Sequence, residues 1–350
     1  MIAASQAYAA RTPGREGSVR SAGSGTSAPT TDRASETTQR ARVFVAARTE
    51  RATELGRLLA DRVGEPEALA RALRRGLVEL ADPEYHATQA FVAPGIGITL
   101  GVRSPLLRAL GRGFRSATRR DSPVSLLLAA DTLLREPELE AHWFAFGILS
   151  LTLPRDHERT WQIVRRAGRE AGDWITVDTL AHTLAAGILA EPYRWAELEQ
   201  LVYSPSRWER RLAASTIATI PFANRTAGRT PDTARHGLEV LSLLIGDAEP
   251  DVQKAIAWAY RSLALVDAEA TTVALETEAE NAVGNDDGHR AWVIRDALTK
   301  LEPTASTRIR TRLLGIRRRS AAPSTSRAAE IAGRFAGLGL GQPIPEPPLS

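Results

Sequence analysis

Three segments of the sequence place an aromatic ring and a charged side chain three or four residues apart. The pairs are Trp174 with Asp178, Trp208 with Arg211, and Trp258 with Arg261, the last preceded by Lys254. Residues at these spacings are neighbours on the surface of a helix. A carboxylate beside a ring is a candidate for catalysis, and a cation beside a ring is a candidate for binding.

In two of these segments, a helical wheel places the aromatic and charged residues away from the centre of the helix's apolar stripe. In residues 251–264, Trp258 and Arg261 lie off the stripe, with Lys254 between them. Burial of the ring against a neighbouring helix is the alternative explanation. In residues 174–189, Trp174 and Asp178 lie on the shoulder of the stripe. There we expect a carboxylate close to solvent, whose replacement leaves folding nearly intact.

Helix ends and ion pairs offer simpler roles for some of the same residues. Asp173 follows a glycine and is the expected N-cap of the helix that carries Asp178. Ser206 and Glu209 form a capping-box pattern, which accounts for Glu209. Taken alone, Arg211 is best explained by an ion pair with an acid on the next helix.

Several kinds of chemistry are excluded by what the sequence lacks. It contains no cysteine, which rules out a disulfide scaffold, a thiolate zinc site and a cysteine nucleophile. It contains no phosphate-binding Walker loop, no dinucleotide-binding glycine motif, no zinc-protease motif and no serine-hydrolase elbow. The six histidines show no metal-ligand spacing. We therefore expect neither a metal nor a cofactor.

The elements that must position these residues are helices. Apolar residues recur with helical period in successive windows between positions 52 and 300, including 66–80, 104–118, 157–170, 174–189, 207–219 and 251–264. No stretch shows sustained two-residue alternation. The pattern predicts an all-α fold, and a HEAT-like α-solenoid of stacked antiparallel helix pairs fits best. A compact irregular bundle is the alternative.

The two ends of the chain differ from the middle. Residues 1–40 contain no Leu, Phe or Trp, and we predict a disordered extension over residues 1–45, a repeat domain over 46–303 and a basic, then Pro-rich tail over 304–350. The basic stretch of the tail forms either a last helix or, as we favour, a solvated segment. The net charge of +4 comes from the ends, since residues 51–300 hold 30 basic and 34 acidic residues. No apolar run could span a membrane, and we expect a cytoplasmic monomer.

Three motifs in order, WITVDTLA at 174–181, SRWERRLAA at 206–214 and DVQKAIAWAYR at 251–261, resemble the AlkD-type DNA alkylation repair glycosylases. These are HEAT-like repeat proteins that bind DNA on a concave face. The resemblance covers residues 85–303. It implies that Asp178 is the catalytic carboxylate and Trp174 the ring beside it, that Arg211 contacts the DNA backbone, and that Trp258 and Arg261 are the second ring and its arginine. Lys254 is a weaker candidate for phosphate contact.

The chemistry that the resemblance implies suits these residue types. Alkylation at N3 or N7 makes a purine cationic and a good leaving group, so that cleavage of its glycosidic bond needs no general acid. A carboxylate about 4 Å from the developing sugar cation contributes roughly 4 kcal/mol, or about a thousandfold in rate. Asp178 either supplies this stabilisation or orients and deprotonates the attacking water. The family is known for acting without base flipping.

We therefore expect a metal-independent DNA glycosylase that excises alkylated purines, such as 3-methyladenine and 7-methylguanine, from double-stranded DNA. Bulky N3 or N7 adducts are further candidate substrates. Two alternatives stay open. One is a non-catalytic protein that binds DNA structures on the same scaffold, and the other is a HEAT-repeat scaffold for protein partners. Steep loss of DNA binding with rising salt would exclude the second.

Overall fold

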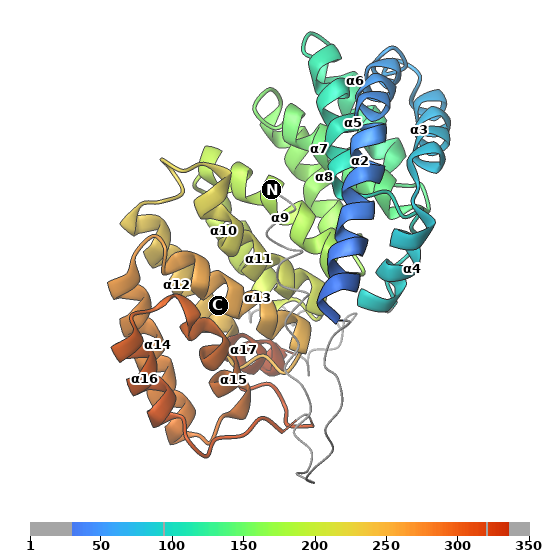
Figure 1. The fold of residues 1–350 in the computed structure, drawn as a ribbon. Coiled ribbons are helices and arrows are strands. Elements are labelled where there is room, and N and C mark those ends of the chain that lie inside the picture. Colours follow the sequence, from blue (N-terminus) through green and yellow to red (C-terminus); the bar gives the residue numbers. More distant parts are fainter. Residues whose placement is uncertain (1–29, 94, 320, 336–350) are drawn as a thin grey trace, which may run out of the picture. The chain divides into compact units, whose positions relative to one another are not determined.

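The computed structural model describes residues 30–93, 95–319 and 321–335, and within these ranges the protein is built from helices (Figure 1). The same ranges hold no β-strand, and one isolated antiparallel bridge joins Ala81 and Val102. The predicted all-α fold is therefore confirmed. The chain divides into two compact units, residues 1–163 and 164–350.

The described part of the first unit, from residue 30 onward, holds six complete helices and the first half of a seventh. They are α2 (Thr30–Ala60), α3 (Pro66–Leu80), α4 (Pro83–Val92), α5 (Ser104–Ala117), α6 (Pro123–Leu133), α7 (Leu139–Thr152) and α8 (His157–Glu170). A proline in the first turn of α3, α4, α5 and α6 starts each helix where no backbone donor is needed. The structure adds α4 to the helices expected from apolar periodicity.

The second unit begins within α8 and continues to the last described helix. Its elements are α9 (Trp174–Ala190), α10 (Arg194–Gln200), the 3-10 turn η1 (Leu201–Tyr203), α11 (Arg207–Ala223), α12 (Pro231–Leu244), α13 (Pro250–Leu263), α14 (Ala268–Gly284), α15 (Gly288–Ala297), the turn η2 (Leu298–Lys300), α16 (Pro303–Arg312) and α17 (Arg327–Phe335). The predicted helical windows from 174 to 300 all coincide with these elements.

Alternate helices pack side by side in both units, which is the arrangement of a solenoid. In the second unit α9, α11, α13 and α15 form one layer, and α12, α14 and α16 form the other. In the first unit α2, α5 and α7 pack in sequence, while α3 packs on α6. Each helix therefore buries its apolar stripe against the next repeat and its own partner. This pattern confirms the solenoid and argues against the irregular bundle.

Two glycines let α2 and α5 meet backbone to backbone. A Cβ atom added at Gly56 would lie 2.0 Å from the carbonyl oxygen of Leu110, and one added at Gly113 would lie 2.0 Å from the carbonyl oxygen of Thr53. No side chain larger than hydrogen fits at either position. The register of α2 on α5 is therefore fixed by the sequence.

The chain ends differ from the prediction where they are described. Helix α2 begins at Thr30, inside the extension that we expected to be disordered; residues 1–29 lie outside the described residues. The reason is continuity, because the anchored second half of α2 propagates upstream through a stretch, Thr30 to Leu55, that contains neither Gly nor Pro to break the helix. At the other end, the first part of the basic stretch, to Arg312, lies in α16, while Arg317, Arg318 and Arg319 follow outside a helix and α17 comes after them. The Pro-rich segment from Gln342 lies outside the described residues.

The arginines of α16 explain why a helix forms there instead of a solvated segment. Arg308 pairs with Glu276, and Arg312 pairs with Glu280 at 2.7 Å, so α16 is held along the acidic side of α14. The proposed boundaries of the repeat domain, at residues 46 and 303, stay a prediction. None of the described helices is both long enough and apolar enough to cross a lipid bilayer.

Candidate functional site

Helix α9 carries the predicted catalytic carboxylate on a well-defined frame. Asp173 caps its N-terminus, accepting hydrogen bonds from the backbone N–H of Ile175 and of Thr176, both at 2.9 Å. This confirms the expected N-cap. The predicted stripe, including Val177 and Leu184, is fully buried. The helix therefore has a fixed rotation, and the direction of the Asp178 side chain follows from it.

Asp178 and Arg211 form a bidentate ion pair between α9 and α11. Arg211 donates from Nε to Oδ1 at 3.0 Å and from Nη2 to Oδ2 at 2.7 Å. Asp178 is 7% exposed and Arg211 is 5% exposed. The expectation that Asp178 is close to solvent is therefore wrong. Its place on the shoulder of the stripe turns it toward α11, and a second helix covers the shoulder.

Ser215 completes the surroundings of the carboxylate. Its Oγ donates to Oδ1 of Asp178 at 2.7 Å, and the residue is fully buried. Three donors thus occupy the carboxylate, and among the described residues Oδ2 accepts from Arg211 alone, which leaves one of its acceptor positions open. Sequence reasoning missed Ser215, although it lies one helical turn after Arg211 and shares its face of α11.

The remaining nitrogen of Arg211 reaches a third helix. Nη1 donates to the backbone carbonyl oxygen of Asp251 at 2.6 Å, in the first turn of α13. The guanidinium carbon lies 5.9 Å from the centre of the Trp174 ring. The structure therefore brings Trp174, Asp178 and Arg211 together, and it confirms that Arg211 pairs with an acid on a neighbouring helix.

The other three predicted site residues lie on α13. Lys254 is exposed, while Trp258 and Arg261 are partly buried. Arg261 donates from Nη1 to Oδ2 of Asp296 at 2.7 Å, on α15. Helix α13 is linked to the Asp178 pair through Asp251, not through these three side chains.

The segment before α11 is organised differently from the expected capping box. Ser206 is the N-cap residue but makes no side-chain capping bond. Glu209 instead accepts a hydrogen bond from Ser204 Oγ, which also accepts from the Ser206 backbone N–H at 3.1 Å. In a capping box the Glu209 side chain would accept from the Ser206 backbone N–H, and here Ser204 Oγ stands between the two groups. The ring of Trp208 contacts Arg207, 4.7 Å away, and not Arg211.

His182 follows Asp178 by one turn of α9 and is the nearest titratable neighbour on that helix. Burial lowers the pKa of His182 below its ordinary value of 6.5, and the charge of Asp178 opposes this only in part. Its Nδ1 atom is buried without a hydrogen-bond partner in the described part of the chain. The neutral imidazole is therefore the stable form at neutral pH.

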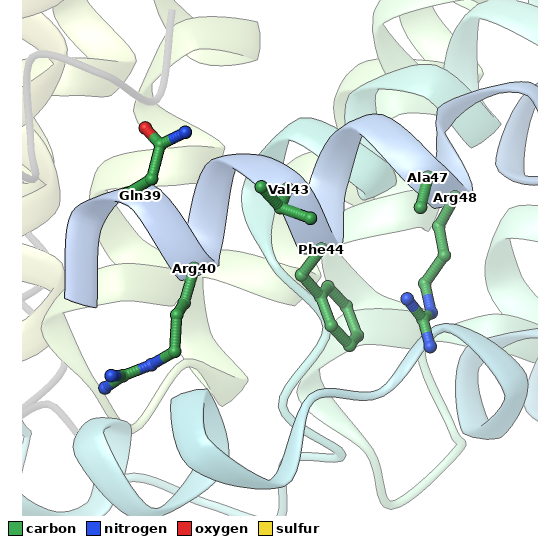
Figure 2. A pocket seen from close by; sticks show the side chains of 6 residues that line it. All are labelled: Gln39, Arg40, Val43, Phe44, Ala47 and Arg48. Atoms are coloured by element: carbon green, nitrogen blue, oxygen red, sulfur yellow. The ribbon is translucent and has the colours of Figure 1, made fainter. Parts of the chain in front are cut away.

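Two hollows on the surface belong to the first unit. One is lined by Arg71, Arg74, Arg75 and Val78 of α3. The other follows α2 and is lined by Gln39, Arg40, Val43, Phe44, Ala47 and Arg48, with the Arg48 guanidinium 3.8 Å from the Phe44 ring centre (Figure 2). Neither hollow contains Asp178.

Comparison with known proteins identifies the family of the chain. The model of the DNA alkylation repair enzyme family matches residues 73–301. A solved structure of a predicted DNA alkylation repair enzyme from Enterococcus faecalis is similar at 15% identity, covering 67% of this chain and 97% of that one, with a TM-score of 0.48. No curated protein matches the sequence. The chain belongs to the DNA alkylation repair enzyme family, and DNA is accordingly its substrate.

Proposed function

We propose that the protein is a DNA glycosylase that removes cationic alkylated purines from double-stranded DNA. The observation that carries the proposal is the fixed carboxylate of Asp178, held by Arg211 and Ser215 beside the Trp174 ring. Such a group has the charge and the orientation to stabilise a cation that develops on a sugar.

The reaction breaks the bond between C1′ and the purine nitrogen. The bonding electrons leave with the alkylated base, which loses its positive charge, and the oxygen of a water molecule forms the new bond to C1′. The transition state resembles an oxocarbenium ion. The proton lost by the water passes to Asp178 or to bulk solvent. No metal and no cofactor take part in this scheme.

The arrangement of donors favours electrostatic stabilisation over base catalysis as the role of Asp178. Oδ1 already accepts two hydrogen bonds, from Arg211 and from Ser215, and Oδ2 accepts one from Arg211. Hydrogen bonds to an ionised carboxylate favour its charged form, which makes the group a poor proton acceptor. The free acceptor position on Oδ2 is the edge that would face C1′.

Arg211 has two successive roles in this proposal. In the DNA-free protein its guanidinium neutralises Asp178, which lowers the cost of burying the carboxylate. For the expected backbone contact, one of its nitrogens turns to a phosphate beside the lesion. That step would leave Asp178 less compensated at the moment when the sugar becomes cationic. Trp174 and Trp258 are proposed to contact the deoxyribose, and Arg261 and Lys254 the flanking phosphates.

Excision without base flipping is the second part of the proposal. It rests on the resemblance of the motifs at 174–181, 206–214 and 251–261 to a family known for acting without base flipping. An enzyme that flips its base encloses it in a pocket next to the catalytic group. An enzyme that does not flip is expected to accept bulky N3 or N7 adducts as well as methyl groups.

The direct test is release of 3-methyladenine and 7-methylguanine from methylated duplex DNA by the wild type and by Asp178→Asn. Release by the wild type, reduced at least a hundredfold in the variant, is the expected result. A matched variant, Asp232→Asn, changes an exposed carboxylate elsewhere in the same unit and should keep most of the activity. Release of bulky adducts in the same assay tests the second part.

The strongest rival is a protein that binds DNA and does not cut the glycosidic bond. The neutralisation of Asp178 by Arg211 is the observation that favours it. This rival predicts salt-dependent DNA binding that is equal in wild type and Asp178→Asn, with no base released by either. Such a result, with both proteins folded, would replace the glycosylase proposal.

A further inference from the structure

The segment that follows α16 returns across the second unit and is built into it. It comprises residues 316–319 and 321–326, here called the C-terminal strap, and it lies beyond the residues matched by the family model. Arg318 donates from Nη1 to Oε1 of Gln253 at 2.9 Å, and the Thr325 backbone N–H donates to the carbonyl oxygen of Gly246 at 2.9 Å. The strap ends at Ser326, which is buried and directly precedes α17. Its Oγ accepts a hydrogen bond from the Ala329 backbone N–H in the first turn of that helix.

Two glycines mark the places where the strap lies against the rest of the unit. A Cβ atom at Gly288 would come within 2.2 Å of the carbonyl oxygen of Arg317. Gly246 has a φ of +98°, and a Cβ atom there would lie 2.5 Å from Oγ1 of Thr325. Backbone contacts this close require the strap to occupy one position, so it is a fitted part of the unit and not a loose tail.

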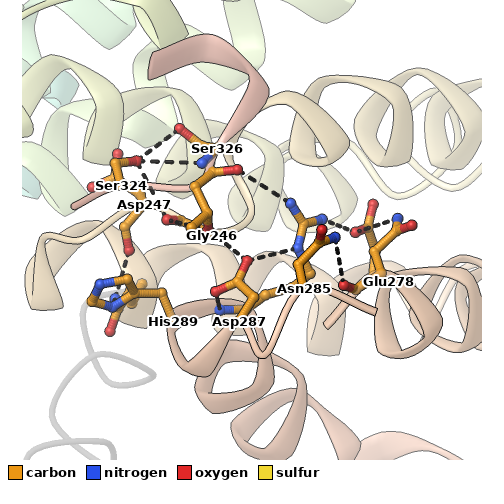
Figure 3. A network of polar contacts seen from close by, with 12 residues as sticks. Gly246, Asp247, Glu278, Asn285, Asp287, His289, Ser324 and Ser326 are labelled. Carbon is orange, nitrogen blue, oxygen red and sulfur yellow. Dashed lines mark hydrogen bonds and ion pairs between the residues drawn. The ribbon is translucent and has the colours of Figure 1, made fainter. Parts of the chain in front are cut away.

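A polar network joins the strap residues Ser324 and Ser326 to the region of Asp247 and His289 (Figure 3). Gln253, which is fully buried on α13, belongs to this network. Its Nε2 contacts the carbonyl oxygen of Asp247 at 2.5 Å and Nδ1 of His289 at 3.0 Å. His289 in turn reaches the carbonyl oxygen of Ala322, on the strap, through Nε2 at 3.0 Å. Every polar atom of the Gln253 side chain is thus engaged, which fixes the first turn of α13 relative to the strap.

The same turn is also contacted by two arginines of α11. Arg210 pairs with Asp247, Nε to Oδ2 at 2.7 Å, and Arg211 donates to the carbonyl oxygen of Asp251 at 2.6 Å. Residues 246–253 are therefore contacted both by the strap and by the arginines of α11. Arg211 holds Asp178 with its remaining nitrogens.

We propose that the C-terminal strap is a positioning element for the catalytic pair, acting from Arg318 through Gln253 and the first turn of α13 to Arg211 and Asp178. This proposal rests on the proposed glycosylase function for its kinetic consequence and on the contacts above for its structural one. It assigns a role to a part of the chain that lies outside the residues matched by the family model.

Full-length variants test the proposal without removing the strap. Arg318→Ala takes away the contact with Gln253, and Arg318→Lys can restore a donor at that place. Arg319→Ala is the matched control, because Arg319 is the next residue along the chain and its side chain pairs with the exposed Asp286. Release of methylated bases is measured in single turnover with the protein in excess, and DNA affinity is measured separately.

Arg318→Ala should slow single-turnover release about tenfold while leaving DNA affinity within about twofold, because a small displacement of a reacting group affects rate before binding. Arg318→Lys should recover most of the rate, and Arg319→Ala should equal the wild type. A wild-type rate in a folded Arg318→Ala variant would overturn the proposal. An equal loss of rate in Arg319→Ala would do so too.

A readout that does not depend on activity separates this proposal from the proposed function. The Nε–H of Arg211, bonded to Asp178, gives a nitrogen–proton NMR signal that can be assigned by its loss in Arg211→Lys. The signal should shift in Arg318→Ala and stay in place in Arg319→Ala. If it does not move, the strap does not position the pair. If it moves but the wild type releases no base, the proposed function fails and the positioning contact stands.

Discussion

Both units of the molecule bury carboxylates among hydrogen-bond donors, and Glu140 and Asp178 differ in the kind of donor that holds them. Glu140, on α7 of the first unit, is fully buried and accepts from the backbone N–H groups of Leu100, Gly101 and Val102, at 2.9 to 3.2 Å. Asp178, on α9 of the second unit, accepts from the side chains of Arg211 and Ser215. One carboxylate organises a loop, and the other is held by groups that can move.

The difference separates a structural carboxylate from one suited to chemistry. Backbone amides are fixed by the chain, so Glu140 and residues 100–102 form a unit that no ligand could open without unfolding the loop. Side-chain donors can rotate to a new partner at little cost to the backbone. Burial alone would have treated the two acids alike; the nature of their partners distinguishes them.

The largest effect is expected for Asp178→Asn, which should reduce base release about a thousandfold, the value of one charge near the developing cation. The amide also places a donor against Arg211, so the free energy of unfolding should fall by about 2 kcal/mol. Single-turnover excision and urea unfolding measure the two effects. Retention of more than a tenth of the wild-type rate would remove Asp178 from the reaction.

Glu140→Ala should destabilise the protein by about 3 kcal/mol or more, because three buried backbone donors lose their acceptor. Glu140→Gln should cost much less, since its oxygen can occupy the position of Oε1, which accepts from all three amides. Chemical denaturation gives both values. At a temperature where the variants are folded, base release should equal that of the wild type. A selective loss of activity would contradict the division between the two acids.

Ser215→Ala should lower the free energy of unfolding by about 1 kcal/mol and base release by about tenfold, as expected for one lost hydrogen bond to a charged group. Ser215→Thr retains the hydroxyl and serves as the control for its presence. Double-mutant cycles with Asp178→Asn, scored by urea unfolding, should show the two residues to be coupled. Additive effects would mean that the bond does not orient the carboxylate.

The smallest effect concerns His182 and pH. Because burial lowers its pKa below 6.5, the unfolded chain binds a proton more readily than the folded protein does. The stabilisation is complete above the unfolded pKa and is lost as the pH falls through the folded value. His182→Gln should flatten this part of the melting profile. An unchanged slope would show that His182 does not contribute.

Most of the fold follows from periodicity, because each solenoid helix buries one stripe and exposes the rest. The stripes of α9 and α13 were predicted residue by residue, and Val177, Leu180, Val252 and Ile256 are all fully buried. Helix α4 and the upstream half of α2 were not predicted. Their helicity depends on a neighbouring cap and on an anchored downstream half, which apolar spacing does not record.

The site was predicted less completely than the fold. The pairing of Trp174 with Asp178 needed only helical spacing within α9. The bond to Ser215 and the reach of Arg211 to Asp251 depend on how α9, α11 and α13 are offset, which is set by packing between repeats. The depth of Asp178 was misjudged for the same reason, since a wheel drawn for one helix omits the helix that covers its shoulder.

The paired glycines of α2 and α5 have a consequence for the exposed face of α2. Gly56 and Gly113 fix how the anchored half is rotated, and a continuous helix transmits that rotation to its first half. The side chains of Val43, Phe44 and Arg48 therefore point in a direction that the packing of α2 on α5 determines. Inserting or deleting one residue between positions 48 and 53 would turn these side chains by about 100° without changing any of them.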